Sequence, residues 1–160
     1  MGTVTRHTDI EAPPQRVWAV LEDVSRLPEL SRSTTEVRVD GPLRSVGQEF
    51  DQTVELAGRS FTSTWSVLEL DPAHRLVIEG SVAPGTRYRM TEQLERAGDE
   101  DPGSSTRLSL TMEYRLPFGP LGRLAGRLGV EQRAVAEAEQ VLEGVRRAAE
   151  QPPGTGPEDS

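Results

Sequence analysis

The sequence contains no cysteine and only two histidines. The first absence excludes disulfide bonds, thiolate nucleophiles and cysteine-ligated zinc. His7 and His74 have no partner at a metal-ligand spacing, and no HExxH motif occurs. The sequence also lacks a GxSxG motif, a glycine-rich phosphate loop and a dinucleotide fingerprint. We therefore predict neither a metal site nor a cofactor.

Basic residues are fewer than acidic ones. The chain has 18 basic side chains against 26 acidic ones, which gives a net charge of −8. Nucleic-acid binding depends on dense basic side chains that release counterions from phosphates, so this balance argues against a nucleic-acid partner. Several of the acidic residues fall in two coil-like segments, 99–101 and 158–159, so the acidity does not by itself mark a site.

Long apolar runs are absent as well. No stretch approaches the roughly 18 residues that a membrane helix requires. Residues 1–20 lack the basic start and the apolar run of a secretory signal. We therefore expect a cytoplasmic protein with no integral membrane segment. The pattern indicates no particular oligomeric state.

The N-terminal part of the chain predicts a strand, two short helices and a second strand. Thr3–Ile10 is rich in threonine and favours a strand. Two prolines at 13–14 then open a helix in which apolar residues recur at helical spacing. A second helical turn, Val24–Leu30, is interrupted by Pro28, and the valines of segment 37–39 alternate as in a strand.

The middle of the chain reads as consecutive β-hairpins. Turn residues occur at Ala57-Gly58, Asp71-Pro72 and Pro84-Gly85, and a loop rich in Gly, Asp and Ser spans 97–105. A register set by these turns places the bulky side chains on one face of the sheet, whereas a slip of one residue would invert that face. The predicted cross-strand pairs are Phe50 with Trp65, Val54 with Phe61, Trp65 with Gly80, Val67 with Ile78, Tyr88 with Tyr114, Met90 with Met112, and Leu94 with Leu108.

From Pro120 the apolar residues follow helical spacing as far as Ala149. Glu131 occupies the one polar slot in this stripe. Three glycines lower the helix propensity of the first half, by up to about 1 kcal/mol each, so we expect that half to be the looser one. Segment 151–160 has no large apolar side chain and is predicted to be a disordered tail.

These elements predict an α+β fold in which a curved antiparallel sheet of six to seven strands wraps around the long C-terminal helix. Only that helix is long enough to cover the apolar face of the sheet. The sparse aromatics and the helix glycines leave volume beneath the helix, so we expect a cavity there. A mostly apolar cavity with a few polar groups is typical of a small-molecule site.

The sequence also resembles a known superfamily. The motifs that carry the likeness are Ile10-Glu11-Ala12-Pro13-Pro14, Val17 to Asp23, Leu27-Pro28-Glu29-Leu30, Trp65-Ser66-Val67 ahead of Asp71-Pro72, and Pro117 through Leu128. They are similar to those of START-like helix-grip (SRPBCC) proteins, and within them to bacterial polyketide cyclase/dehydrase-like proteins. The resemblance implies a single helix-grip domain over residues 1–150. It leaves the chemistry open, because members include lipid carriers, aromatase/cyclases, hormone receptors and co-chaperones.

The predicted pocket lies between the concave face of the sheet and the first half of the C-terminal helix. Its predicted lining comprises Phe50, Val54, Phe61, Trp65, Ile78, Tyr88, Met90, Leu110, Met112, Tyr114, Leu121, Leu124 and Leu128. Trp65 could instead plug the core, and the two tyrosines could be rim residues with their hydroxyls in water. We expect ligands to enter near Gly126 and the loop Asp40–Val46, so a bulky residue at Gly126 should impair uptake.

Glu92 is the candidate catalytic residue. In the predicted register it shares a face with Met90, Leu94 and Leu110, and a carboxylate in apolar surroundings is costly unless it is paired or protonated. Its pKa would rise, as suits a general acid or base. Alternatively, a local slip turns Glu92 to solvent, or Arg133 pairs with it. Glu131 is a weaker candidate, because a long helix tolerates one carboxylate at the rim.

Three functions remain open on these grounds. The first is binding of an apolar or aromatic, lipid- or polyketide-like small molecule in the cavity. The second is an aromatase/cyclase type of enzyme, in which Glu92 with Tyr88 or Tyr114 would move protons, although no catalytic motif demands it. The third is a co-chaperone-like module that contacts a protein partner through an exposed face; a cavity filled by side chains would favour this one.

Overall fold

The computed structural model describes the chain except for residues 1, 57, 82–84, 98–104, 116–119 and 152–160. Of residues 56 and 120–130 it describes the backbone alone. Most of the segment predicted to be a disordered tail thus lies outside the described residues. No helix among the described parts of the chain is long and apolar enough to cross a membrane.

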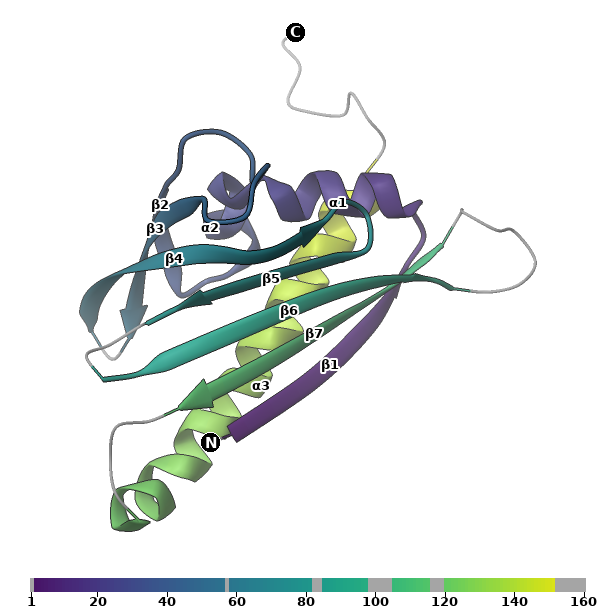
Figure 1. The fold of residues 1–160 in the computed structure, drawn as a ribbon. Coiled ribbons are helices and arrows are strands. Elements are labelled where there is room, and N and C mark those ends of the chain that lie inside the picture. Colours follow the sequence, from purple (N-terminus) through teal and green to yellow (C-terminus); the bar gives the residue numbers. More distant parts are fainter. Residues whose placement is uncertain (1, 57, 82–84, 98–104, 116–119, 152–160) are drawn as a thin grey trace, which may run out of the picture.

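Seven strands and a long terminal helix make up most of the fold, as the sequence predicts (Figure 1). Two short helices and one 3-10 turn follow the first strand. In chain order the elements are β1 (Gly2–Ile10), α1 (Pro14–Glu22), η1 (Val24–Arg26), α2 (Leu27–Leu30), β2 (Thr34–Arg38), β3 (Glu49–Leu56), β4 (Arg59–Asp71), β5 (Arg75–Gly80), β6 (Arg87–Arg96), β7 (Thr106–Arg115) and α3 (Pro120–Glu150).

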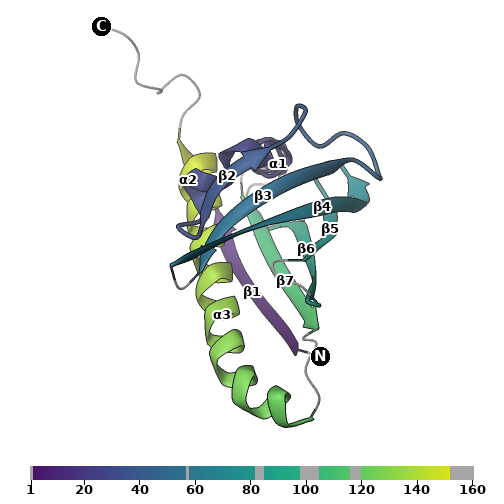
Figure 2. The same ribbon diagram turned by 90° about the vertical axis from the view of Figure 1, so that its left-hand side faces the viewer.

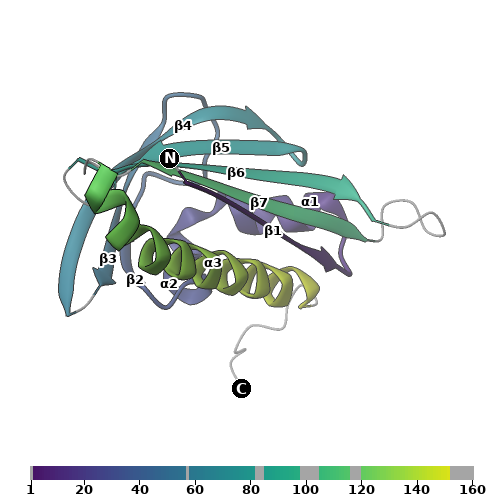
Figure 3. The ribbon, with the colours of Figure 1, turned by 90° about the horizontal axis from the view of Figure 1, so that it is seen from below.

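The strands form one antiparallel sheet in the order β1-β7-β6-β5-β4-β3-β2. The sheet curves around α3, which runs alongside β1 (Figures 2 and 3). Helices α1 and α2 lie at the end of the sheet where α3 finishes, and the contacts of α3 are mainly with β1. This is the expected α+β helix-grip arrangement.

The predicted register is confirmed at all seven cross-strand pairs. On the β3–β4 hairpin, Phe50 pairs with Trp65 and Val54 with Phe61. The remaining pairs, Trp65–Gly80, Val67–Ile78, Tyr88–Tyr114, Met90–Met112 and Leu94–Leu108, follow on the next hairpins. Because the side-chain period of a strand is two, each match also fixes which face a residue occupies.

The apolar stripe on the second half of α3 packs into the main core. Its buried residues are Ala138, Val141, Leu142, Val145 and Ala149. Glu131, which fills the polar slot of the stripe, is exposed. Close packing extends to α2, because a Cβ at Gly144 would lie 2.9 Å from the Cα of Leu30. The helix and the small N-terminal helices therefore hold one another in place.

Gly80 leaves room for the indole ring of Trp65. A Cβ at Gly80 would lie 2.5 Å from Cδ2 of that ring. We expect Gly80→Ala to lower the free energy of unfolding by about 1–3 kcal/mol, because the ring must leave its position. Urea denaturation measures the effect. Combining Gly80→Ala with Trp65→Leu should cost less than the sum of the two single changes, since the smaller side chain relieves the overlap; strict additivity would contradict this explanation.

Candidate ligand-binding site

A cavity of about 510 Å³ lies between the concave face of the sheet, helices α1 and α2, and the second half of α3. This volume falls within the range of small-molecule pockets. Most of its surface is apolar. The lining that the structure describes comprises Val20, Leu21, Asp23, Val24, Leu27, Leu30, Ser31, Ser33, Phe50, Gln52, Val54, Glu55, Trp65, Leu76, Ile78, Tyr88, Met90, Glu92, Met112, Arg133, Ala134, Ala136, Glu137, Gln140, Val141 and Val145.

Eight of the residues singled out from the sequence border this cavity. They are Phe50, Val54, Trp65, Ile78, Tyr88, Met90, Glu92 and Met112. The residues on β6 follow the strand alternation, because Tyr88, Met90 and Glu92 point to the same face. Tyr88 and Glu92 are four residues apart, so the cavity extends at least roughly 13 Å along this strand.

Three residues expected in the lining lie outside it. Leu110 is 1% exposed and belongs to the main core, and Tyr114 packs with Val4 and Ala134 over Gly2. Both lie on β7, beside β1, the strand against which α3 packs. Their side chains are therefore surrounded by other core residues and do not face the cavity. Phe61 is half-buried near the turn of the β3–β4 hairpin, and on β4 the cavity is bordered by Trp65, four residues farther along.

The remaining predictions fall on the first half of α3. The side chains of Leu121, Leu124 and Leu128 lie outside the described part of the structure, as does the proposed entrance at Gly126. The cavity contacts of α3 that the structure describes begin at Arg133.

Trp65 serves both the core and the cavity wall. Its side chain is only 3% exposed, and its ring stacks on Phe50 with centroids 6.5 Å apart and planes 10° from parallel. The indole Nε1 donates a hydrogen bond of 3.1 Å to the hydroxyl of Ser63. With its only polar atom satisfied, the indole presents an apolar flat surface to a ligand.

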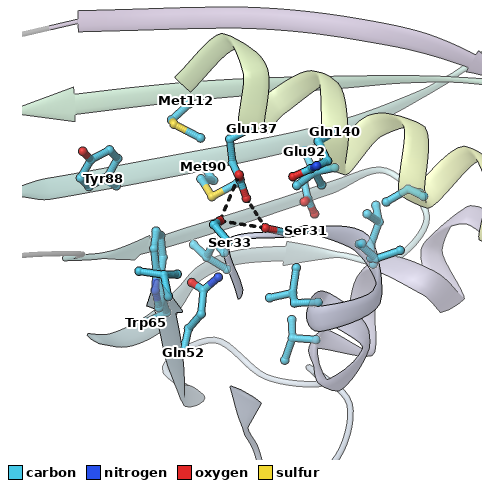
Figure 4. A pocket seen from close by; sticks show the side chains of 18 of the residues that line it. Ser31, Ser33, Gln52, Trp65, Tyr88, Met90, Glu92, Met112, Glu137 and Gln140 are labelled. Carbon is cyan, nitrogen blue, oxygen red and sulfur yellow. Dashed lines mark hydrogen bonds between the residues drawn. The ribbon is translucent and has the colours of Figure 1, made fainter. Parts of the chain in front are cut away.

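The phenol of Tyr88 lies at the other end of the cavity from Glu92 (Figure 4). Its ring packs against that of Tyr114, with centroids 6.1 Å apart. Burial raises the pKa of the Tyr88 hydroxyl above its ordinary value, and the nearby Tyr114 adds to the shift. The hydroxyl therefore stays protonated at neutral pH and can donate a hydrogen bond.

Glu92 carries the most perturbed carboxyl group of the site. Within the part of the chain that the structure describes, it forms neither a hydrogen bond nor an ion pair, and Arg133 does not pair with it. Every fully buried polar side-chain atom among the described residues does have a hydrogen-bond partner, so the carboxyl oxygens of Glu92 must reach the cavity space. Burial raises the pKa of this carboxyl from 4.5 to about 7.

A second polar group on the cavity wall joins α3 to the chain after α2. The hydroxyls of Ser31 and Ser33 donate hydrogen bonds to the two carboxylate oxygens of Glu137, the latter at 3.1 Å (Figure 4). Thr34 contacts Ser31 at 3.3 Å and receives a hydrogen bond of 2.7 Å from Gln52. The network thus runs from the helix to strand β3.

Sequence reasoning missed this network. At its centre are two serines between α2 and β2 and a glutamate on α3, which lies 106 residues away in sequence from its partner Ser31. One signal was present, since Glu137 is three residues after Ala134 and four before Val141, on the buried face of the helix.

The described residues include no group of three or more histidine, cysteine, aspartate or glutamate side chains that could hold a metal ion. What the arrangement offers is a largely apolar cavity bordered by four carboxyl groups, of which Glu137 is held by hydroxyls and Glu92 has no partner among the described residues. Such a cavity can enclose an apolar molecule and exchange a proton or hydrogen bond with its polar end.

Comparison with known proteins agrees with this architecture. An uncharacterized protein of Mycobacterium tuberculosis H37Rv is 29% identical over 128 residues, which cover 79% of this chain and 87% of that protein. A crystal structure of a protein from Thermus thermophilus has a TM-score of 0.75 at 20% identity and covers 92% of this chain and 97% of its own.

The Zhui aromatase/cyclase from Streptomyces sp. R1128 has the same fold, with a TM-score of 0.75, 22% identity and 93% coverage of each chain. The family model for polyketide cyclase/dehydrase and lipid transport proteins matches residues 1–150. The chain therefore belongs to the polyketide cyclase/dehydrase and lipid transport family.

Proposed function

We propose that this protein binds an apolar or aromatic small molecule in the cavity between the sheet and α3. The observation that carries the proposal is the cavity of about 510 Å³ with its largely apolar lining. Family membership supports a ligand-binding or cyclase role without choosing between them. Affinity would come mainly from apolar burial, at about 25 cal/mol per Å² before the costs of binding are subtracted.

The shape of the cavity favours an elongated or planar ligand. The stacked rings of Phe50 and Trp65 form a flat wall, and Tyr88, Met90 and Glu92 extend along β6. The methionines 90 and 112 add flexible apolar surface that can adapt to different ligands. A lipid-like chain or a fused-ring, polyketide-like compound fits this description.

Met90 supplies the test, because its side chain enters the cavity from the middle of β6. We expect Met90→Trp to weaken binding of the apolar fluorophore N-phenyl-1-naphthylamine by about tenfold, or about 1.4 kcal/mol, since the indole fills the space. Fluorescence titration measures the affinity. Thr91→Trp is the matched control, because the next residue of a strand points to the other face of the sheet. Equal binding by both variants would place the probe outside the cavity and contradict the proposal.

Native mass spectrometry of freshly purified protein gives a second readout. A molecule that co-purifies with the wild-type chain, and that Met90→Trp excludes, would belong to the cavity. Its chemical class would then be known directly.

The unpartnered Glu92 favours an aromatase/cyclase type of enzyme as the second candidate. A carboxyl group with a pKa near 7 can both donate and accept a proton at neutral pH. A catalyst of this kind would convert a bound poly-carbonyl chain with loss of water, whereas a carrier would return its ligand unchanged. Analysis of the recovered ligand by mass spectrometry distinguishes the two.

A further inference from the structure

The cavity has a one-sided charge distribution among the described residues. Four acidic side chains border it, namely Asp23, Glu55, Glu92 and Glu137, against the single basic side chain of Arg133. The ion pairs of the described part of the chain all lie elsewhere, for example where Glu79 binds Arg87 and Arg89 on the outer face of the sheet. Arg133 and Glu55 are both exposed, so water weakens the effect of each on the interior, and the acidic excess there comes from Asp23, Glu92 and Glu137.

The two inner carboxyl groups differ in what already satisfies them. Glu137 accepts hydrogen bonds from Ser31 and Ser33, whereas Glu92 has no partner in the described structure. In the sheet register Glu92 lies between two buried leucines, Leu76 and Leu110. An unpaired carboxylate in such surroundings costs several kcal/mol, and a cation brought by the ligand would remove much of that cost.

We propose that the cavity selects apolar ligands that carry one positive charge, such as an alkyl or aryl amine in its protonated form, and that this ammonium group pairs with the carboxylate of Glu92. The inference rests on the proposed binding function and adds the charge of the ligand to it. A carboxylate ligand, such as a fatty acid, would bring another anion into a cavity that already holds several. A neutral ligand would leave Glu92 without a counter-charge.

Pairing of this kind makes binding depend on pH with a definite sign. Glu92 must be ionised to attract the ammonium, and burial raises its pKa in the free protein to about 7. An alkylamine stays protonated over this range, as lysine does. The affinity should therefore increase with pH, by up to about tenfold per unit below pH 7, and level off above it. The other titratable groups that face the cavity are Asp23, Glu55, Tyr88, Arg133 and Glu137.

The experiment compares three ligands with the same chain and different ends: decylamine, decanol and decanoate. Each competes with N-phenyl-1-naphthylamine for the full-length protein between pH 5.5 and pH 8.5. At pH 8 decylamine should bind at least about tenfold more tightly than decanol, and decanoate should bind more weakly than both. In Glu92→Gln the preference for the amine and its pH dependence should disappear together, while decanol still binds. In Glu137→Gln the pH dependence should remain.

Different failures have different meanings. If the fluorophore and all three competitors fail to bind, the proposed binding function is wrong. If they bind but decanol or decanoate competes as well as decylamine, the function stands and the charge assignment is overturned. Affinity that decreases as pH increases would show that protonated Glu92 donates to a neutral acceptor, which also overturns it. Loss of the amine preference in Glu137→Gln alone would transfer the site to that residue and overturn the role given to Glu92.

Discussion

Replacing Glu92 with glutamine is expected to raise the free energy of unfolding by about 3 kcal/mol at pH 8 and by much less at pH 5. The carboxyl titrates near 4.5 in an unfolded chain and at about 7 in the fold. Below pH 4.5 the carboxyl is neutral in both states and does not lower the free energy of unfolding. Between pH 4.5 and 7 the unfolded state releases a proton that the folded state keeps, so stability falls as pH increases. Above pH 7 the carboxyl is ionised in both states, and the loss of stability that it causes no longer changes with pH.

Urea denaturation of the ligand-free protein at pH 5 and pH 8 measures this difference. Glu137→Gln is the matched control, because that carboxylate accepts hydrogen bonds from Ser31 and Ser33 and should show no such gain. An equal gain from Glu92→Gln at both pH values would show that ionisation of the buried carboxyl is not its source.

Leu110→Ala is expected to lower the free energy of unfolding by about 2–5 kcal/mol and to leave ligand affinity unchanged. Leu110 is 1% exposed within the main core and does not border the cavity. Removing its side chain opens a hole that the surrounding core fills only in part. Urea denaturation and titration with N-phenyl-1-naphthylamine measure the two effects separately.

Met112→Ala provides the comparison for Leu110, because it lies two residues farther along the same strand and does border the cavity. Its truncation enlarges a space that already exists, so we expect a smaller loss of stability and a clear change in probe affinity. If Leu110→Ala also changed probe affinity without loss of stability, the placement of this leucine in the core would be wrong.

Taken together, these variants separate two uses of the concave face. On the part beside β1, Leu110 and Tyr114 of β7 are buried among core residues and stabilise the fold. The part over β3 to β6 remains open and borders the cavity. Glu92 borders the cavity. Its buried charge lowers the free energy of unfolding, and the same charge is proposed to strengthen the binding of a cationic ligand.

The hairpin turns and the alternation of side chains predicted the register of the sheet correctly. Phe50 opposite Trp65 and Met90 opposite Met112 follow from where each turn lies, and the turn is a local property of the chain. The inward orientation of Glu92 follows in the same way. The family could also be predicted from the sequence, because its motifs coincide with the elements that the pattern indicates.

Local patterns could not predict how far α3 covers the sheet. All residues on the concave face of β7 looked equivalent in the sequence, yet Leu110 and Tyr114 are enclosed while Met112 reaches the cavity. The hydrogen bonds from the serine hydroxyls to Glu137 could not be predicted from local patterns either, because they join segments about a hundred residues apart in the chain.

The amino-acid sequence by itself thus determined the order of elements, the strand register and the face on which each strand residue lies. These follow from backbone periodicity and turn chemistry over a few residues. The tertiary structure alone decided which of the inward residues are core and which line the cavity, and which polar groups find partners. Those outcomes depend on where α3 and α2 dock on the curved sheet, and packing between distant segments, such as Gly144 against Leu30, sets that position.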